Sequence, residues 1–235
     1  MVDPKSVSQL FSGERIVFNH LKAEGFLDSF ENKRILEIGP KHGKDSILLA
    51  TLNPSELVLI DLPEKKSMVR EWLPQLSNKC KTVFLEGNIL YLTQEQYNQL
   101  GKFDLIWCLG VLYHNVEQLR LLKRLYDLSN MNGCVVIESE TARNKKLEKL
   151  NVVEIHWPHT FKNLQTITHL PSRLAIKSWL EIVGFSNVKI WEDIYSRRLG
   201  RQRAVLTGRK TREAKPHISY SESGLNPPYV VGDSN

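Results

Sequence analysis

The feature that most constrains the fold of this chain is an alternation of short apolar runs and helical patterns that begins at residue 34. Helical patterns cover 44–52, 64–76, 94–100 and 115–129. The apolar runs between them have the composition of buried parallel strands and lie at Ile35–Ile38, Leu57–Ile60, Thr82–Leu85, Leu105–Cys108 and Cys134–Ile137. Strands that alternate with helices form a parallel sheet covered on both faces. The sequence therefore predicts an α/β fold with a doubly wound sheet.

The alternation stops after the fifth apolar run. Residues 141–171 are polar, rich in His and Trp and without a clear period, so we expect an insert on the substrate side. A helix pattern that ends at Gly184 follows, and then two strand candidates, Val188–Ile194 and Arg203–Leu206. This late pair predicts a hairpin that completes a seven-stranded sheet with an antiparallel edge strand.

The length of 235 residues suffices for one well-buried α/β core. We expect a single domain over 34–210, preceded by an N-terminal helical cover over 1–33 in which residues 7–30 form a helix pair. The polar stretch 211–235 predicts a mobile C-terminal tail.

Composition excludes several classes of protein. No apolar run approaches the roughly 18 residues that a membrane span needs, and the N-terminus lacks the apolar core of a signal peptide, so we expect a cytoplasmic protein with no membrane partner. Cys80, Cys108 and Cys134 lie far apart, without the C-x-x-C spacing of a zinc or redox site.

The net charge of +6 permits an anionic partner without requiring one. The excess is uneven, because residues 196–215 contain eight Lys or Arg and one Glu. A solvated basic surface and a nucleic-acid contact are both compatible with this segment.

The first strand and the turn after it, RILEIGPKHGKDS, have the layout of a cofactor site. Gly39 ends the strand and lets a ligand approach the backbone, and the next helix directs its N-terminal N–H groups to the same place. The dinucleotide fingerprint G-x-G-x-x-G is absent. An ordinary strand-to-helix connection is the alternative. The candidate cofactor contacts here are Glu37, Gly39, Pro40 and Gly43.

The ends of the second and third strands suit an adenosine. Asp61 falls 22 residues after Gly39, where a carboxylate can accept hydrogen bonds from both ribose hydroxyls, with Leu62 beside it. A helix cap is the alternative role for Asp61. At the end of the third strand Asn88 can accept from an adenine amino group, with Ile89 beside the ring.

The fourth strand and its loop, FDLIWCLGVLYH, resemble class I S-adenosylmethionine-dependent methyltransferases. More narrowly, GVLYH, LPSRLAIKSWLEIVGF and QRAVLTGRK resemble the tRNA wobble-uridine carboxymethyltransferase family. The resemblance covers about residues 34–210. It implies a Rossmann-like methyltransferase sheet and a cofactor whose amino acid end lies at Glu37 and Gly39, with Leu109 and Gly110 along the fourth strand.

The carboxymethyl family uses a carboxylated form of S-adenosylmethionine. Its motifs include a tyrosine and an arginine that align with Tyr113 and Arg203. The family also uses a lysine before the first strand, which has no placed equivalent in residues 1–33, and a larger N-terminal extension implicated with tRNA, which is missing here. We therefore favour S-adenosylmethionine over carboxy-S-adenosylmethionine.

Methyl transfer is an in-line displacement, so the protein must align the nucleophile and the methyl group at about 3 to 3.5 Å. A hydroxyl or ammonium acceptor also needs a base. His114, after the methyl-facing loop, is the first candidate because imidazole titrates near neutral pH, and Tyr113 is the second catalytic candidate. The alternative for His114 is a structural place at the start of a helix.

Substrate contacts are expected at the end of the fifth strand, in the insert and on the last strand. The H-W-P-H sequence places two histidines at i and i+3, but no thiolate lies nearby, and we expect no metal site. The candidate substrate-binding residues are Glu138, His156, Trp157, His159 and Arg203.

The leading functional hypothesis is an S-adenosylmethionine-dependent methyltransferase that acts on an oxygen or nitrogen atom of a small molecule. The second is an RNA-modifying enzyme, directed at a tRNA uridine, that transfers a methyl or carboxymethyl group. The third is a non-catalytic nucleotide-binding module that keeps the fold. Its support is the degenerate first motif, which has Pro40-Lys41-His42 at positions where a further glycine is common in cofactor-binding turns. The sequence does not predict an oligomeric state or the acceptor atom.

Overall fold

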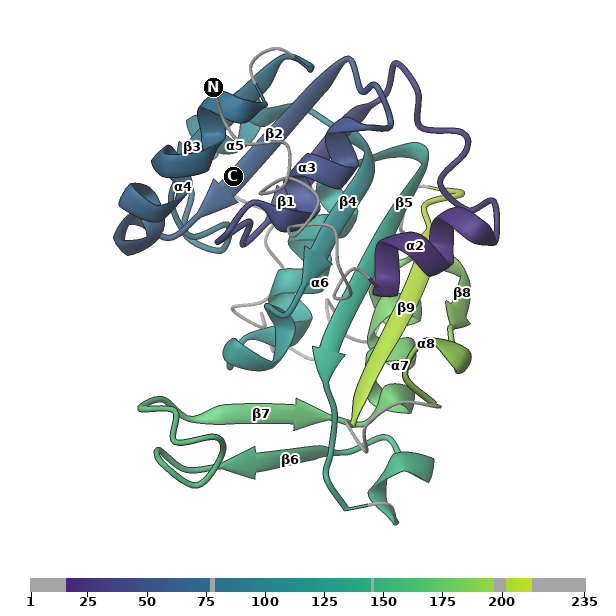
Figure 1. Ribbon diagram of the computed structural model, residues 1–235. Helices are drawn as coiled ribbons and strands as arrows, with labels where there is room; N and C mark the ends of the chain where they lie inside the picture. The colour runs from purple at the N-terminus through teal and green to yellow at the C-terminus, as the bar shows by residue number, and fades with distance from the viewer. Residues whose placement is uncertain (1–15, 77–78, 145, 197–201, 213–235) are drawn as a thin grey trace.

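The computed structural model of the chain describes residues 16–76, 79–144, 146–196 and 202–212. A central sheet of seven strands has the order β3-β2-β1-β4-β5-β9-β8. Strands β1 to β5 are parallel, and β9 runs antiparallel to both of its neighbours, β5 and β8. The strands are β1 (Arg34–Ile38), β2 (Glu56–Asp61), β3 (Thr82–Glu86), β4 (Phe103–Leu109), β5 (Ser129–Glu140), β8 (Ser186–Ile190) and β9 (Arg203–Arg209). The predicted doubly wound, seven-stranded sheet with one antiparallel strand is confirmed, and this strand, β9, is the last but one, next to β8 (Figure 1).

Helices cover both faces of the sheet. On one face pack α2 (Ile16–Ala23), α3 (Lys44–Ala50), α4 (Lys66–Trp72) and α8 (Asp193–Ser196). On the other pack α5 (Gln94–Leu100), α6 (Gln118–Leu128) and α7 (Arg173–Val183). Strand residues alternate between the faces, so Ile35 faces the first set and Leu36 the second.

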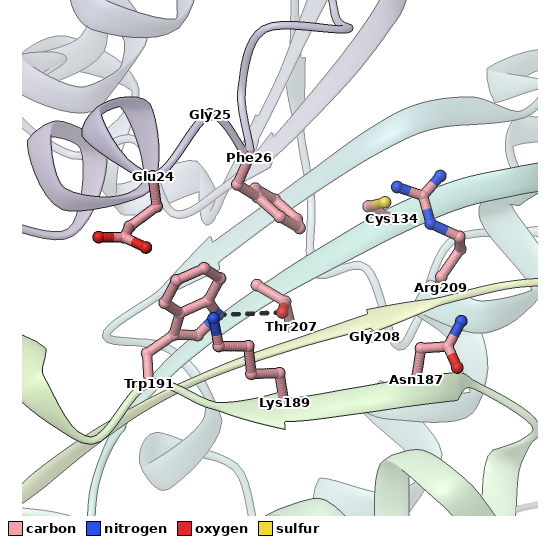
Figure 2. A pocket seen from close by; sticks show the side chains of 10 residues that line it. All are labelled: Glu24, Gly25, Phe26, Cys134, Asn187, Lys189, Trp191, Thr207, Gly208 and Arg209. Carbon is pink, nitrogen blue, oxygen red and sulfur yellow. Dashed lines mark hydrogen bonds between the residues drawn. The ribbon is translucent and has the colours of Figure 1, made fainter.

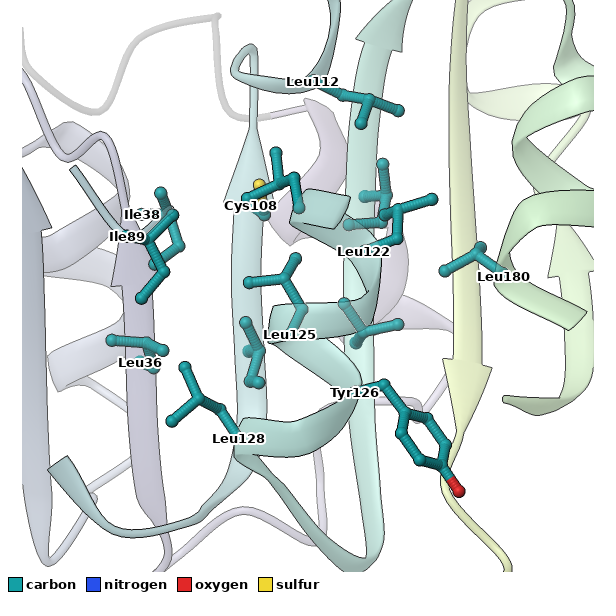
Figure 3. Close-up of a cluster of buried hydrophobic side chains, with 14 of the residues drawn as sticks. Leu36, Ile38, Ile89, Cys108, Leu112, Leu122, Leu125, Tyr126, Leu128 and Leu180 are labelled. Atoms are coloured by element: carbon teal, nitrogen blue, oxygen red, sulfur yellow. The ribbon is translucent and has the colours of Figure 1, made fainter. Parts of the chain in front are cut away.

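The centre of the second face is the packing of α6 against β1, β4 and β5. Figure 3 shows Leu122, Leu125 and Leu128 of α6 directed at the sheet, where Leu36 and Cys108 are fully buried. The leucines recur at intervals of three residues, which places them on one helical face. On the same helix Leu119 is only partly buried, whereas Leu121 is fully buried in the core.

Helix α7 begins and ends where the sequence predicts. The Ser172 hydroxyl accepts a hydrogen bond from the Ala175 N–H at 3.0 Å, an N-cap. Gly184 follows the last turn with φ 117°, a backbone conformation that favours glycine.

The predicted insert has more order than its sequence indicates. It contains a second sheet of two antiparallel strands, β6 (Val153–His156) and β7 (Thr168–Pro171), which crosses beyond the end of β5 (Figure 1). A short 3-10 turn, Leu147–Lys149, precedes it. Three further 3-10 turns lie at Pro63–Lys65, Leu73–Gln75 and Leu112–His114.

Two predicted elements are wrong in part. The second helix of the N-terminal pair is absent from residues 24–29, which form turns, because Gly25 takes φ +72° and ends α2. The strand predicted over Val188–Ile194 ends at Ile190. Trp191 and Ile194 are both buried while the two residues between them are exposed, and this i, i+3 spacing suits the short helix α8.

Some predictions fall outside the described residues. These are residues 7–15 of the helix pair, 213–235 of the C-terminal tail and 197–201 of the basic segment. In the part of the chain that the structure describes, no helix combines the length and apolar character needed to cross a bilayer.

Candidate functional site

The predicted cofactor residues come together because parallel strands end at one edge of the sheet. Ile38 pairs with Ile60 on one side and with Cys108 on the other, so the residues that follow these strands emerge side by side. Leu109 pairs with Glu138 in the same way. The candidates gathered at this edge are Glu37, Gly39, Pro40, Gly43, Asp61, Leu62, Asn88, Ile89, Leu109, Gly110 and Glu138.

The turn after β1 is tightly wound. Gly39, Lys41 and Gly43 all take positive φ, at 73°, 46° and 68°. A Cβ on Gly39 would lie 2.9 Å from Cγ2 of Val111 in the loop after β4. The turn and the β4 loop therefore approach each other closely only because Gly39 has no side chain.

Two buried carboxylates hold this turn. The Lys41 N–H donates to Oδ2 of Asp61 at 3.0 Å, and the Leu62 N–H donates to Oδ1 at 2.8 Å. The Ser46 hydroxyl, in the first turn of α3, donates to Oε2 of Glu37 at 2.5 Å. A carboxylate accepts up to about four hydrogen bonds, so Asp61 keeps acceptor capacity for a ligand.

Trp72 of α4 supports the same turn from outside. Its indole N–H donates to the Lys41 carbonyl at 2.9 Å, and its ring fills the space beside Gly43, where a Cβ would lie 2.2 to 2.5 Å from ring atoms. Sequence reasoning missed both Trp72 and Ser46, and no motif marks either one.

After the end of β3, the side chain of Asn88 also has a structural role. The Asn88 side-chain oxygen accepts from the Leu90 N–H at 3.0 Å, which closes a turn. This is the oxygen predicted to accept from an adenine, and an amide oxygen has a second lone pair for that bond. Ile89 is buried in the core of the sheet's second face, with an exposed fraction of 4%.

Beyond β4 the chain forms a single 3-10 turn, Leu112–His114, which carries both catalytic candidates. The Gly110 N–H donates to the Glu138 carbonyl at 3.0 Å and fixes the start of this loop to β5. The rings of Tyr113 and His114 lie against each other, with centroids 4.0 Å apart.

The two catalytic candidates have displaced pKa values. Burial raises the pKa of Tyr113. His114 is open to solvent on one side, but loss of water around the rest of its ring lowers its pKa, and the charges of Arg203 and Lys41 act in the same direction. His114 is therefore a neutral imidazole at pH 7, the form that can accept a proton.

Arg203, at the start of β9, lies beside the end of β5, and its guanidinium lies over the ring of Tyr113. Its guanidinium donates to both carboxylate oxygens of Glu138, at 2.6 Å from Nη2 to Oε2, and to Oε1 of Glu140. Lys162 of the insert also donates to Glu140. Burial alone would lower the pKa of Arg203, but the hydrogen bonds and charges of these carboxylates outweigh it and raise that pKa.

The insert covers this cluster with part of the predicted substrate residues. The Phe161 ring is buried with its centroid 6.3 Å from that of Tyr113 and 5.4 Å from that of His156. His156 pairs with Glu154 at 2.8 Å. Trp157 and His159 instead lie at the surface, Trp157 with 68% of its side chain exposed.

No group of three or more His, Cys, Asp or Glu placed to hold a metal ion occurs within 16–76, 79–144, 146–196 or 202–212. The site consists of the glycine turn of residues 39–43, the buried carboxylates Glu37 and Asp61, the Tyr113–His114 loop and the ion pairs around Arg203. This arrangement can hold a nucleoside with a charged amino acid end and present one face of it to a neutral imidazole.

Comparison with known proteins agrees with this geometry. A family model described as a methyltransferase domain matches residues 15–190. Curated relatives are tRNA U34 carboxymethyltransferases: that of Campylobacter jejuni subsp. jejuni serotype O:6 is 28% identical over 184 residues, and that of Helicobacter pylori strain Shi470 is 28% identical over 160 residues. These matches cover 74% and 68% of this chain but only 56% and 59% of the relatives.

Solved structures share the fold. The N-terminal domain of EvdMO1, solved with S-adenosylhomocysteine bound, matches with a TM-score of 0.64 and 20% identity, covering 84% of this chain and 82% of that one. An S-adenosylmethionine-dependent methyltransferase from Mesorhizobium loti matches with a TM-score of 0.62 and 13% identity, covering 85% and 99%.

Proposed function

This chain belongs to the methyltransferase domain family, and from that premise we propose that it methylates an oxygen or nitrogen atom of a small molecule. The chain is an enzyme of the S-adenosylmethionine-dependent methyltransferase class. The observation that carries the proposal is the turn of residues 39–43, which Asp61 ties to the second strand beside the Tyr113–His114 loop.

The residues at the sheet edge fit S-adenosylmethionine. Gly39 lets the turn lie closely against Val111 of the β4 loop, and the buried Glu37 lies behind the same turn, where it would face the amino acid end. Asp61 would receive the ribose hydroxyls with its remaining acceptor capacity. Leu109 and Gly110 would line the path toward the acceptor. S-adenosylmethionine, when bound, supplies an electrophilic methyl group on a sulfonium.

We assign the proton transfer to His114. Its lowered pKa keeps the imidazole neutral at pH 7, so a ring nitrogen can accept the acceptor's proton as the new bond to the methyl group forms. Tyr113 packs against His114 and keeps its hydroxyl protonated, because burial raises its pKa. We propose that Tyr113 orients the acceptor by hydrogen bonding.

The ion pairs of Arg203 support the uncarboxylated cofactor. Nε, Nη1 and Nη2 of Arg203 each donate to Glu138 or Glu140. Three of its five N–H groups are therefore used by two buried carboxylates, and a carboxylate on the cofactor would bring a third negative charge beside them, which is unfavourable. We therefore propose that S-adenosylmethionine is bound in preference to carboxy-S-adenosylmethionine.

The same cluster favours a small acceptor over RNA. Two of the cations beside the Tyr113–His114 loop, Arg203 and Lys162, are each paired with a carboxylate. RNA binding depends on Lys and Arg side chains that neutralise phosphates. A neutral small molecule needs no such cations.

A tRNA uridine is the second candidate acceptor, and one observation favours it. The curated relatives with 28% identity are tRNA U34 carboxymethyltransferases. The chain spans little more than half the length of those relatives.

Calorimetric titration with S-adenosylhomocysteine tests the cofactor site. We expect micromolar or tighter binding that Asp61→Ala and Gly39→Val abolish, while Asp28→Ala leaves it unchanged, because Asp28 is an exposed partner of Lys22 far from this edge. Wild-type protein that takes up no ligand would refute the proposed function. Repeating the titration with carboxy-S-adenosylmethionine and Glu140→Gln tests the cofactor preference, since removal of one carboxylate should improve binding of the carboxylated form.

The acceptor class is tested by salt dependence. Binding of an unmodified tRNA transcript should be weak, with little product formed at any salt concentration. Tight tRNA binding that weakens steeply between 50 and 200 mM salt, together with methylated or carboxymethylated uridine in the product, would replace the small-molecule proposal by the RNA one.

A further inference from the structure

A cavity of about 310 Å³ lies between the end of α2 and the strands β5, β8 and β9. Figure 2 shows Phe26 above it, Lys189 and Trp191 at one end, and Asn187 and Arg209 at the other. Strand β9 connects it with the candidate methyl-transfer site, because Arg203 begins that strand and Arg209 ends it. The Arg209 end of the cavity therefore lies at the opposite end of β9 from Arg203.

The two cations of this cavity, Lys189 and Arg209, differ from Arg203 and Lys162 of the methyl-transfer site in their pairing with carboxylates. Among the residues that the structure describes, neither Lys189 nor Arg209 forms an ion pair with a carboxylate. The Lys189 ammonium lies 3.4 Å from the centroid of the Trp191 ring. Arg209 donates from Nη1 to the Asn132 carbonyl at 2.7 Å, which fixes the guanidinium and leaves its other N–H groups available.

The backbone directs a further polar group into the cavity lining. The ladder between β8 and β9 shifts register between Ser186 and Lys189, and Asn187 within this bulge has φ +53°. Asparagine tolerates that left-handed conformation, and bulges at sheet edges reorient side chains. The Asn187 amide consequently lies beside Arg209 in the lining (Figure 2).

The walls of the cavity are fixed by aromatic packing. The Phe26 and Trp191 rings meet edge to face with centroids 6.0 Å apart, and the Trp191 indole N–H donates to the Thr207 hydroxyl at 3.0 Å. Glu24 lies at the rim on the Trp191 side (Figure 2). An anion is therefore attracted to the Arg209 end and repelled from the Glu24 end.

We propose that this cavity binds a small phosphate monoester, with its phosphate at Arg209 and Asn187 and the remainder along Phe26 toward Lys189. Its volume falls at the lower end of the range of about 300 to 1,000 Å³ that is usual for ligand pockets, which fits a molecule of nucleotide size. A monoester is a dianion above about pH 6, so its phosphate pairs more strongly with the Arg209 guanidinium than the phosphate of a singly charged diester does.

Nuclear magnetic resonance of ¹⁵N-labelled protein tests this proposal. The Trp191 indole signal, assigned by comparison with Trp191→Phe, reports on the cavity itself. Adenosine 5′-monophosphate should shift it saturably at pH 7.5, inorganic phosphate should do so more weakly, and adenosine should leave it unchanged. Lowering the pH to about 5 should weaken binding of the monoester.

Charge-removing variants identify the residues responsible. Arg209→Gln should weaken binding of adenosine 5′-monophosphate by about tenfold or more, since a hydrogen bond to the charged phosphate is lost, and Lys189→Gln should weaken it less, because Lys189 lies toward the other end of the cavity. Lys177→Gln is the matched control, because Lys177 is a surface lysine on α7 that pairs with Glu181. Thermal melts confirm that each variant is folded.

Three results would overturn the proposal. The first is an equal response to adenosine and adenosine 5′-monophosphate, and the second is binding of the monoester that both Gln variants retain in full. The third is binding of the diester adenylyl-3′,5′-adenosine as tight as that of the monoester, which would indicate a general nucleic-acid contact. Adenosine, which the proposed cofactor site would also accept, controls for ligand bound there, and the Trp191 signal reports on the cavity, so failure of this proposal is distinguishable from failure of the proposed function.

Discussion

Replacement of Gly43 by alanine tests whether the contact between the cofactor turn and Trp72 organises the site. Two costs add at this position. Gly43 has φ +68°, and the left-handed backbone costs a residue with a Cβ about 1 to 2 kcal/mol. The new Cβ would also lie 2.2 to 2.5 Å from the Trp72 ring, and overpacking of this kind costs about 1 to 3 kcal/mol. We expect Gly43→Ala to lower the free energy of unfolding by about 2 to 5 kcal/mol.

Gly25→Ala separates the two costs. Gly25 has φ +72°, but a Cβ there would meet its nearest neighbour, Oδ2 of Asp28, at an ordinary 3.4 Å. This variant should lose only the backbone term of about 1 to 2 kcal/mol. At about 2 to 4 °C per kcal/mol for a protein of this size, thermal melts should place the midpoint of Gly43→Ala about 2 to 12 °C below that of Gly25→Ala.

Calorimetry gives a second measure of the same contact. Displacement of the Trp72 ring disturbs the Lys41 carbonyl, which accepts from its indole, and so the Lys41 N–H that donates to Asp61. Gly43→Ala should therefore weaken S-adenosylhomocysteine binding, whereas Gly25→Ala should not. Equal losses of stability in the two variants, with equal ligand affinity, would show that Trp72 does not brace the turn.

Three further predictions concern pH. Because the pKa of His114 is lowered from its usual 6.5, kcat/KM should be retained above pH 6.5 and lost as the pH falls through the lowered pKa. This acid limb of the pH profile should disappear in the residual turnover of His114→Gln. An acid limb that persists in this variant would remove His114 as the base. The hydrogen bonds from Lys81 and Arg34 lower the pKa of Glu56, so the contribution of Glu56 to stability is present above about pH 4.5 and lost as the pH falls. Urea melts at pH 7 and pH 4 should therefore show a smaller loss of stability in acid for Glu56→Gln than for the wild-type protein. Burial raises the pKa of Tyr97, so the contribution of Tyr97 to stability is complete below about pH 10 and lost at higher pH. Tyr97→Phe removes the hydrogen bond to the Arg124 carbonyl and should lower the free energy of unfolding by about 0.5 to 1.5 kcal/mol at pH 7. In urea melts at alkaline pH this variant should lose less stability than the wild-type protein.

The fold could be predicted because the sheet is buried on both faces. Each of β1, β2 and β4 is a nearly continuous apolar run, and such runs between helical patterns have few other solutions. The positions of Gly39 and Asp61 follow from the same logic, because residues that end parallel strands must meet at one edge. Their roles toward a ligand remain proposals.

The contacts that shape the site depend instead on partners distant in sequence. Trp72 meets Gly43 from the far end of α4, and Arg203 meets Glu138 across 65 residues. Nothing in the local pattern around Trp72 distinguishes it from an ordinary core aromatic residue. These pairings become visible only once the order of strands is known.

The insert hairpin shows a different reason for failure, since its period-2 pattern is reversed. In VEIH, the start of the hairpin, the polar Glu154 and His156 lie on one face of β6, opposite the fully buried Leu170 and Thr168 of β7, whereas Ile155 is 59% exposed. A strand whose polar residues face the protein and whose isoleucine faces solvent gives no amphipathic signal for a hydrophobic core. His156 pairs with Glu154, and Phe161 covers Tyr113, so this hairpin packs on a polar cluster instead of an apolar one. Trp157 continues the outward-facing side of β6 and is exposed, so the substrate contact predicted for its ring would be made at the surface of the insert.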